Sequence, residues 1–411
     1  MKQILKFPKD FLWGAASSSY QTEGGNTNAD WWTWEHSQKR EMELRAKGLD
    51  PAGFCSGEAC DFYHRFDEDF SLAQHLNHNA IRFGIEWSRI QPKEGVFDEA
   101  VMDHYEKIFQ SAKYHGLTVF LTLHHYTNPL WFAKKGGFSK KQNLIHFLNY
   151  AKKMVARYSQ YVDFWVTINE PELYAMQSYL VGTFPPQKKN LFLTLRTVNN
   201  LISAHNELSV YIKQNYPAPV SMAFNQVDLE PSGFLGEFAV RIVRYFANSY
   251  ILSRTIKFCD FIGVNYYFHH HLSILGWRRH SAHKHELTDR GWGIHPEGME
   301  PVLMGLKDFG KPIYILENGL ADAKDSRREK YIKDNLYYVY KAISRGADVR
   351  GYLHWSLTDN FEWEEGHGPK FGLIEIDRND LLRRKVRYSA LKYAEICKNN
   401  QFEYEVETKP A

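Results

Sequence analysis

Short apolar runs recur along the chain, and within most of them apolar and polar residues do not alternate. Continuous apolar runs of this length are typical of strands that are buried on both faces, as in a parallel sheet. The runs cover residues 11–17, 80–88, 117–123, 164–168, 220–224, 261–267, 312–316 and 349–356.

Amphipathic helices are predicted between these runs. In residues 141–158 and again in 332–343, apolar side chains recur at helical spacing, and the second stretch ends before Gly346. Strands and helices therefore alternate, and no Pro/Gly/Ser-rich linker or break in composition divides the chain. This pattern favours one closed barrel over two doubly wound domains. We predict an α/β fold in which residues 1–411 form a single (β/α)8 TIM barrel.

Composition excludes several classes of function. The 44% apolar content is sufficient for a packed core, and 51 Lys and Arg against 48 Asp and Glu give a net charge of only +3. A nucleic-acid partner is therefore not expected, because it needs a concentrated basic surface. The chain has neither an apolar segment of signal-peptide length nor a membrane-spanning one, which predicts a soluble cytoplasmic protein. Four cysteines are too few for a disulfide scaffold.

Two stretches contain possible metal ligands, but neither is interpreted as a metal site. Cys55 and Cys60 have a spacing that fits no zinc pattern well. Residues 268–286 contain six of the nineteen histidines, but Arg, Lys and Ser are mixed among them as in a solvated loop. We predict a surface loop there and no metal site.

The fourth apolar run ends in an unusual way, because residues 164–168 continue directly into Asn169, Glu170 and Pro171. Strands usually end in turn residues. Proline restricts the residue before it to non-helical geometry, so we expect Glu170 to be presented from a stiff, extended backbone. Taken alone, the stretch fits a strand end capped by Asn169 as well as it fits a functional carboxylate.

Functional residues of a (β/α)8 barrel come from the C-terminal ends of its strands. Two of these runs lead directly into a strand-tip glutamate, Glu170 after the fourth run and Glu317 after the seventh, and these strands face each other across a barrel. Glycoside hydrolysis requires two such carboxyl groups, a proton donor and a carboxylate facing the anomeric carbon. Other polar or aromatic residues at these ends are Gln21, Glu23, Arg82, His124, His125, Asn169, Asn265, Tyr267, Trp355, Glu362 and Trp363.

Motifs along the chain resemble those of glycoside hydrolase family 1, the β-glucosidase-type retaining glycosidases, and the resemblance extends from Phe7 to about residue 397. Several stretches and the short length are similar to a compact subgroup found in prokaryotes, including archaea. The motifs occur in the family's order and read FLWGAASSSYQTEG, RFGIEWSRIQP, TINEP, DFIGVNYY, YILENG, GYLHWSLTDNFEW and FGLIEID.

The resemblance implies a role for each matching residue. Glu170 would be the acid/base and Glu317 the nucleophile of a retaining mechanism, with carboxyl groups about 5 to 5.5 Å apart. Arg82 would keep Glu317 ionised, and the charge of Glu317 with partial desolvation would raise the pKa of Glu170. Asn169 would hold the sugar 2-hydroxyl. Tyr267 would flank the nucleophile together with Arg82, and Phe371 would close one wall. The residues implied around the sugar are Asn265, Gln21, His125, Trp355, Glu362 and Trp363.

The substrates implied are small β-glycosides or short oligosaccharides, with no cofactor. Glucosides, galactosides and fucosides are not ranked by the sequence. One alternative is an enzyme of this fold that acts on 6-phosphorylated sugars. Glu362 argues against it, because its negative charge would repel the phosphate, and Lys370 is the basic candidate in the same segment. The other is a non-catalytic sugar-binding barrel, which should have lost a catalytic carboxylate, although both are present.

Three residues depart from the family pattern. Leu316 stands where Thr or Ser is usual, which removes a hydroxyl close to Glu317. Tyr126 replaces a common Trp or Phe, and Thr127 replaces a frequent Asp. We expect the last two to lie at the rim and to affect the preference for the aglycone.

Overall fold

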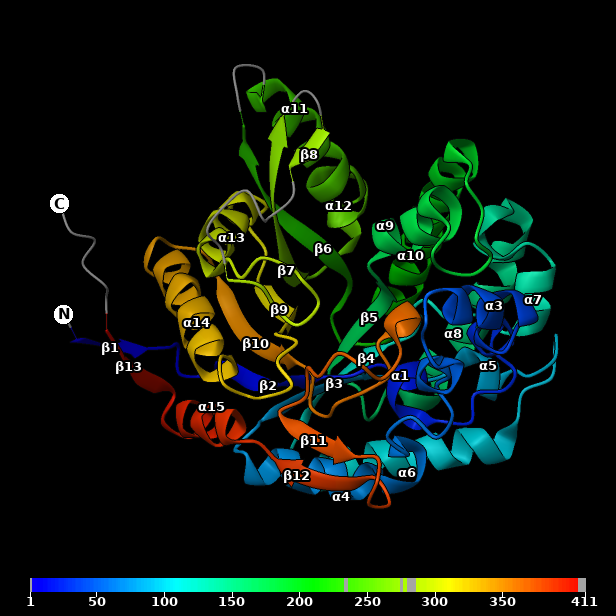
Figure 1. Ribbon diagram of the computed structural model, residues 1–411, viewed down its shortest axis with the longest axis horizontal. Helices are drawn as coiled ribbons and strands as arrows, with labels where there is room; N and C mark the ends of the chain where they lie inside the picture. The colour runs from blue at the N-terminus through cyan, green and yellow to red at the C-terminus, as the bar shows by residue number, and fades with distance from the viewer. Residues whose placement is uncertain (1, 233–235, 274–275, 279–285, 406–411) are drawn as a thin grey trace.

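The computed structural model describes residues 2–232, 236–273, 276–278 and 286–405. Its centre is a closed barrel of parallel strands, each paired with its neighbours in the chain, and the pairing of β6 with β7 completes the sheet (Figure 1). The predicted (β/α)8 barrel is confirmed. Its strands are β2 (Leu12–Ala16), β3 (Ala80–Gly84), β4 (Thr118–Thr122), β5 (Phe164–Asn169), β6 (Val220–Pro231), β7 (Ile262–Ser273), β9 (Ile313–Asn318) and β10 (Val349–Trp355).

Helices cover the outside of the barrel and fill the connections between strands. Those between successive strands or after the last one are α4 (Phe62–His75), α6 (Glu99–Tyr114), α8 (Leu144–Tyr158), α10 (Leu191–Asn215), α12 (Tyr250–Thr255), α13 (Met299–Lys307), α14 (Arg328–Ser344) and α15 (Tyr388–Asn399). Shorter helices in the loops are α1 (Ser19–Glu23), α2 (Asp30–Glu35), α3 (Gln38–Ala46), α5 (Trp87–Ile90), α7 (Leu130–Lys134), α9 (Pro171–Met176) and α11 (Gly236–Arg244).

Further strands lie outside the barrel. β1 (Lys2–Lys6) pairs with β13 (Gln401–Glu405), which brings the two ends of the described chain together, and β11 (Ile374–Asp377) pairs with β12 (Arg383–Val386). β8 (Gly276–Arg278) pairs antiparallel with β7. In the part of the chain that the structure describes, no helix has both the length and the apolarity needed to cross a membrane.

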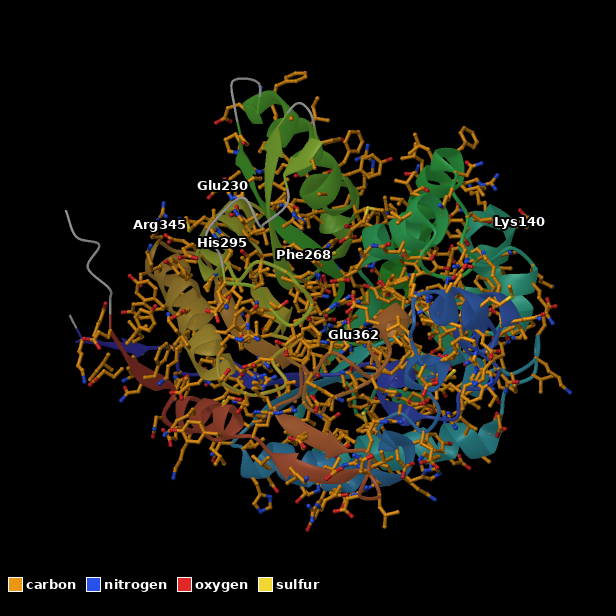
Figure 2. The ribbon with its side chains drawn as sticks, in the orientation of Figure 1. Lys140, Glu230, Phe268, His295, Arg345 and Glu362 are labelled. Carbon is orange, nitrogen blue, oxygen red and sulfur yellow. The ribbon has the colours of Figure 1, made fainter. Side chains whose placement is uncertain are left out.

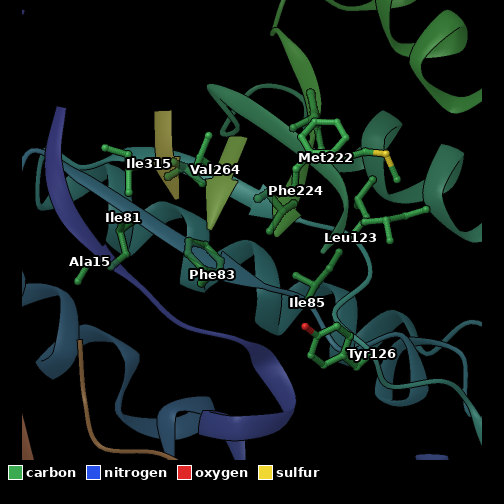
Figure 3. Close-up of a cluster of buried hydrophobic side chains, with 14 of the residues drawn as sticks. Ala15, Ile81, Phe83, Ile85, Leu123, Tyr126, Met222, Phe224, Val264 and Ile315 are labelled. Atoms are coloured by element: carbon green, nitrogen blue, oxygen red, sulfur yellow. The ribbon is translucent and has the colours of Figure 1, made fainter. Parts of the chain in front are cut away.

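Alternation along the strands divides the core into two layers. Ile81 and Phe83 of β3 pack outward in the large cluster beneath the helices, together with Val264 and Ile315 (Figure 3). A second cluster fills the barrel itself and includes Phe120, Val166, Tyr314, Leu316 and Leu353. The barrel interior is therefore a packed core, and polar groups can meet a ligand only at the ends of the strands.

The strands that carry the two glutamates are irregular. The pairing of β5 with β6 shifts between Val166 and Asn169, and that of β9 with β7 shifts so that Asn265 lies opposite Glu317. The side chain of Leu316 points into the barrel over Gly263, where an added Cβ would lie 2.4 Å from its Cδ1. Leu316 therefore replaces the expected hydroxyl with a packing contact that needs glycine on the next strand.

β6 and β7 extend well beyond their barrel neighbours and stay paired as far as Pro231 and Leu272, next to α11 (Figure 1). The predicted surface loop at 268–286 is therefore wrong over residues 268–273, which belong to β7, and over 276–278, which form β8. The continued pairing buries His269 to 1% exposure and His271 to 9%. Residues 274–275 and 279–285 of that prediction lie outside the described residues.

Candidate active site

Glu170 sits at the junction of β5 and α9, and its conformation differs from the prediction. Its φ is 39° and its ψ is 62°, so the backbone is left-handed and not extended. Pro171 excludes the right-handed helical conformation for Glu170, and the left-handed one lets the strand turn directly into α9. Two other residues that line the same cavity, Tyr126 and Trp363, also have positive φ. Such strained backbone clusters at functional sites.

The carboxyl group of Glu170 is 4% exposed and is held by uncharged donors. Asn265 Nδ2 donates to its Oε1 at 2.9 Å, and the Tyr126 hydroxyl donates to its Oε2. Burial, followed by the negative charge of Glu317, raises the pKa of Glu170 to about 7. The predicted direction is confirmed, with burial as the larger cause.

The carboxyl group of Glu317 is held by a charged donor instead. Arg82 Nη1 donates to Oε1 at 2.5 Å, and the Tyr267 hydroxyl donates to Oε2 at 3.0 Å. Burial raises the pKa of Glu317 as well, and Arg82 is the strongest influence in the opposite direction. Arg82 thus acts in the predicted direction, but burial has the larger effect. Because only Glu317 has a cationic partner, we infer that this pair of carboxyl groups loses its first proton from Glu317.

A continuous set of hydrogen bonds joins the two glutamates. Arg82 is fully buried and also donates to Thr122 Oγ1 at 3.0 Å and to Asn169 Oδ1 at 2.6 Å. Asn265 donates to the same Asn169 oxygen at 3.2 Å while it contacts Glu170. The fully satisfied guanidinium fixes the position of Glu317 relative to β5.

These groups open onto a cavity of about 300 Å³ at the barrel mouth. The sequence-predicted residues divide into those that line it and those behind them. Arg82, Asn169, Asn265 and Gln21 are at most 1% exposed and do not line it. The predicted residues that line it are Glu170, Glu317, His125, Tyr267, Trp355, Glu362, Trp363 and Phe371.

The far end of the cavity is organised around Glu362. Gln21 Nε2 lies 3.4 Å from its Oε2, so Gln21 supports Glu362 from below. Arg290 Nη1 donates to Oε1 of Glu362 at 2.6 Å and Nη2 donates to Glu365 at 2.5 Å, with its guanidinium 3.9 Å from the ring centroid of Trp292. Burial raises the pKa of Glu362 to about 7, and the charge of Arg290 opposes this shift.

Arg290 and Trp292 line the cavity and were missed by the sequence reasoning, which had Lys370 as the basic candidate. Lys370 does not line the cavity. The available signal was a cation two positions before a tryptophan in a Gly-containing loop. Nothing in the sequence connects that loop to Glu362, which lies 72 positions further along the chain.

The two expected rim residues have different places. Tyr126 lines the cavity, but its hydroxyl contacts Glu170. Thr127 is 4% exposed and donates to Glu86 Oε2 at 2.9 Å, away from the cavity lining, so its prediction is wrong. The positive φ of Tyr126 turns the chain so that Thr127 points inward. Tyr126 therefore contacts the candidate proton donor directly, and its expected effect on the aglycone stays a prediction.

A closed parallel barrel with two buried carboxyl groups in one cavity at its mouth fits a hydrolase of glycosidic bonds. The family model described as glycosyl hydrolase family 1 matches residues 3–241 and 245–402. The chain belongs to this family and is a glycoside hydrolase.

Several relatives and solved structures are similar over nearly their whole length. Beta-glucosidase A of Thermotoga maritima is 30% identical, covering 97% of this chain and 99% of that protein. A beta-galactosidase of Pyrococcus woesei is 28% identical, over 96% and 97%. Among solved structures, a beta-glycosidase from Pyrococcus horikoshii has a TM-score of 0.88 at 34% identity, over 97% of this chain and 96% of that one. The beta-glucosidase from T. maritima with bound glucoimidazole has a TM-score of 0.88 at 28% identity, over 96% and 99%.

Proposed function

We propose that this enzyme hydrolyses terminal β-D-glucosides and β-D-galactosides with retention of anomeric configuration, through a covalent glycosyl-enzyme. The observation that carries the proposal is the unequal environment of two carboxyl groups in one cavity. Glu317 is paired with a buried cation, whereas Glu170 has uncharged donors and a pKa of about 7. One group can be a nucleophile while the other is an acid. The names of the relatives, beta-glucosidase and beta-galactosidase, support the substrate class.

In the first step, a carboxylate oxygen of Glu317 attacks the anomeric carbon. The bond from that carbon to the leaving oxygen breaks, and its electron pair takes the proton of Glu170. Arg82 and Tyr267 orient the attacking carboxylate, and Asn169, itself held by Arg82, is the group we assign to the sugar 2-hydroxyl. The expected separation of the carboxyl groups, about 5 to 5.5 Å, is part of this proposal.

In the second step, the ester has removed the negative charge of Glu317. That charge is one of the causes that raise the pKa of Glu170, so the pKa falls once the ester has formed. Glu170 then accepts a proton from water, the water oxygen attacks the anomeric carbon, and the ester bond breaks to regenerate Glu317. The same residue thus serves as acid and then as base because its partner's charge changes.

The direct test follows the hydrolysis of 4-nitrophenyl β-glucoside and β-galactoside by NMR. We expect the β-anomer to be released first and the α-anomer to appear only by mutarotation. Glu317→Gln, which keeps the shape of the side chain, is the control and should be nearly inactive. Initial release of the α-anomer, or full activity of Glu317→Gln, would contradict the proposal.

The alternative of a 6-phosphorylated substrate deserves a separate measurement because Arg290 supplies a cation in the cavity. Arg290 is already bound by Glu362 and Glu365, so this end of the site carries more negative than positive charge. A phosphate would add up to two further negative charges. We expect kcat/KM for the β-glucoside to exceed that of its 6-phosphate at least about tenfold, or about 1.4 kcal/mol. A preference for the phosphate would overturn the role of Glu362.

A further inference from the structure

A group of histidine and acidic side chains lies on the extension of β6 and β7, outside the catalytic cavity. Asp228, Glu230, His269 and His295 each offer a ligand atom, and these atoms all lie within 4.8 Å of one another. Figure 2 shows Glu230 and His295 on this side of the molecule, away from Glu362. None of these four side chains lines the catalytic cavity.

The centre of the group is one carboxylate oxygen. Asp228 Oδ2 lies 2.9 Å from His269 Nδ1 and 3.3 Å from His295 Nε2, and the two imidazole rings are stacked with centroids 3.6 Å apart. Ligand atoms 2.0 to 2.1 Å from a tetrahedral zinc ion are separated by about 3.3 Å. The two separations from Asp228 Oδ2 are therefore within a few tenths of an ångström of this value, and the ligand atoms of the group all lie within 4.8 Å of one another.

The surrounding backbone holds the three side chains in place. His269 is 1% exposed on the paired part of β7, and the Tyr266 hydroxyl donates to the backbone oxygen of His295 at 2.8 Å. Gly298 lets the chain after His295 pack directly against β6, since a Cβ there would lie 2.7 Å from Asp228 Cβ. Rigid elements on both sides thus reduce the ordering that metal binding would require.

A partner for the far side of an imidazole is present as well. His269 Nε2 lies 3.1 Å from His271 Nε2, and His271 Nδ1 lies 3.5 Å from Glu230. Metal-bound histidines usually donate their second ring N–H to an acceptor, which fixes the ring orientation. His271 can accept this hydrogen bond while Glu230, exposed at its tip, remains able to reach the metal.

We infer that Asp228, His269 and His295 form a structural site for a divalent transition metal of the zinc type, with Glu230 available as the fourth ligand. Imidazole and carboxylate ligands in this number suit tetrahedral Zn²⁺. This site replaces the interpretation of the histidine-rich stretch as a metal-free surface loop.

The site would fix the loop that shapes the catalytic cavity. His295 follows Arg290 and Trp292 in the same loop, where Thr288 N donates to the Trp292 oxygen, and Phe268, which lines the cavity, directly precedes His269. Metal binding would therefore hold Arg290 against Glu362 from outside the cavity. The inference that metal binds does not depend on the proposed substrate.

The test measures binding of Zn²⁺ itself to the chelator-treated full-length protein by calorimetry, with Co²⁺ absorption as a second readout. We expect one equivalent to bind, with visible bands of tetrahedral Co²⁺, and the melting temperature to rise by a few degrees. Asp228→Asn and His295→Gln should each weaken Zn²⁺ binding at least about 100-fold. Even mutation of a residue that only hydrogen-bonds to a metal ligand lowers metal affinity about 10- to 100-fold. Circular dichroism verifies that the variants are folded.

Two controls locate the site. His64→Gln removes an exposed histidine of α4 that contacts Asp61, and it should leave Zn²⁺ binding unchanged. His280, His283 and His285 lie outside the described residues, and a variant in which all three are replaced by Ser should also retain Zn²⁺ binding. Absence of Zn²⁺ binding by the wild type would overturn the inference. The inference would also be overturned if binding survived Asp228→Asn, or if it were lost only when His280, His283 and His285 were replaced.

Discussion

Two arginine–glutamate pairs of nearly equal length hold the carboxyl groups of the cavity: Arg82, behind the lining, binds Glu317, and Arg290, in the lining, binds Glu362. Arg82 is on a barrel strand, its side chain is 0% exposed, and it makes further hydrogen bonds to neighbouring strands. Arg290 is on a loop, its side chain is 10% exposed, and it lies over Trp292. The same chemical pair is thus built once on the scaffold and once on a connection.

The difference shows how the barrel separates reaction from recognition. The pair on the strands fixes the group that we propose as the nucleophile, for which a small displacement costs much of the rate. The pair on the loop adjusts a group that we assign to sugar hydroxyls, where a displacement changes affinity. Loops can therefore vary the substrate while the strand pair keeps the chemistry.

The largest expected effect comes from removing the carboxylate of the strand pair. Glu317→Gly should lower kcat for nitrophenyl glucoside at least about 10⁴-fold, because no group remains to form the covalent intermediate. Added azide or formate should restore cleavage, since a small anion can occupy the vacated space. Near-normal turnover without an added anion would remove Glu317 from the nucleophile role.

The second effect separates the acid from the nucleophile. Glu170→Ala should slow substrates with poor leaving groups about 10²- to 10⁴-fold, and nitrophenyl substrates far less, because a good leaving group hardly needs a proton. The wild-type pH profile should fall on its basic side as Glu170, with a pKa of about 7, loses its proton. Rate measurements over a series of leaving groups check this, and a basic limb that persists in the variant would argue against the assignment.

A matched pair of substitutions tests the comparison directly. Arg82→Lys keeps the charge but cannot make the three contacts of the guanidinium, so kcat should fall about 100-fold. Arg290→Lys should raise KM about tenfold and leave kcat within about threefold, because Glu362 remains in place. Steady-state kinetics of both variants decide the matter. If both changed kcat alike, the division between reaction and recognition would not hold.

The smallest effect concerns the hydroxyl of Tyr126. Its hydrogen bond lowers the pKa of Glu170, so Tyr126→Phe should raise that pKa and move the basic limb of the rate profile to higher pH by about half to one unit. The acidic limb, set by Glu317, should stay in place. A kcat/KM profile from pH 4 to 9 measures both, and a shift of the basic limb to lower pH would contradict the assignment.

The strand positions and most of the site could be predicted because both depend on local patterns. Apolar runs locate buried strands, and the (β/α)8 rule assigns their ends to one face, which brings Glu170 and Glu317 together without coordinates. The backbone of Glu170 could not be predicted in full. Proline excludes one conformation for this residue, but the choice between extended and left-handed depends on how β5 meets α9.

The loops were harder to predict because their partners are distant in sequence. The stretch at 268–286 has the composition of a solvated loop, yet part of it is buried by pairing with β6, which local composition does not reveal. Arg290 is charged and lies near glycine, as many surface residues do, and only folding places it against Glu362. Recognition of this kind depends on tertiary contacts and has no periodic signal.

The shifted pairing of β9 also has a consequence for how the enzyme can change. Successive side chains of a regular strand point to opposite faces. Tyr314 and Leu316 both point into the barrel, so the next residue, Glu317, departs from this alternation. In a regular strand of the same length, Glu317 would follow the inward-pointing Leu316 onto the face towards the helices, so the shift in pairing is what turns its carboxyl group to the cavity. Substitutions in this strand can therefore be gradual in their effect, whereas loss of the shift without a change in length is expected to abolish activity at once.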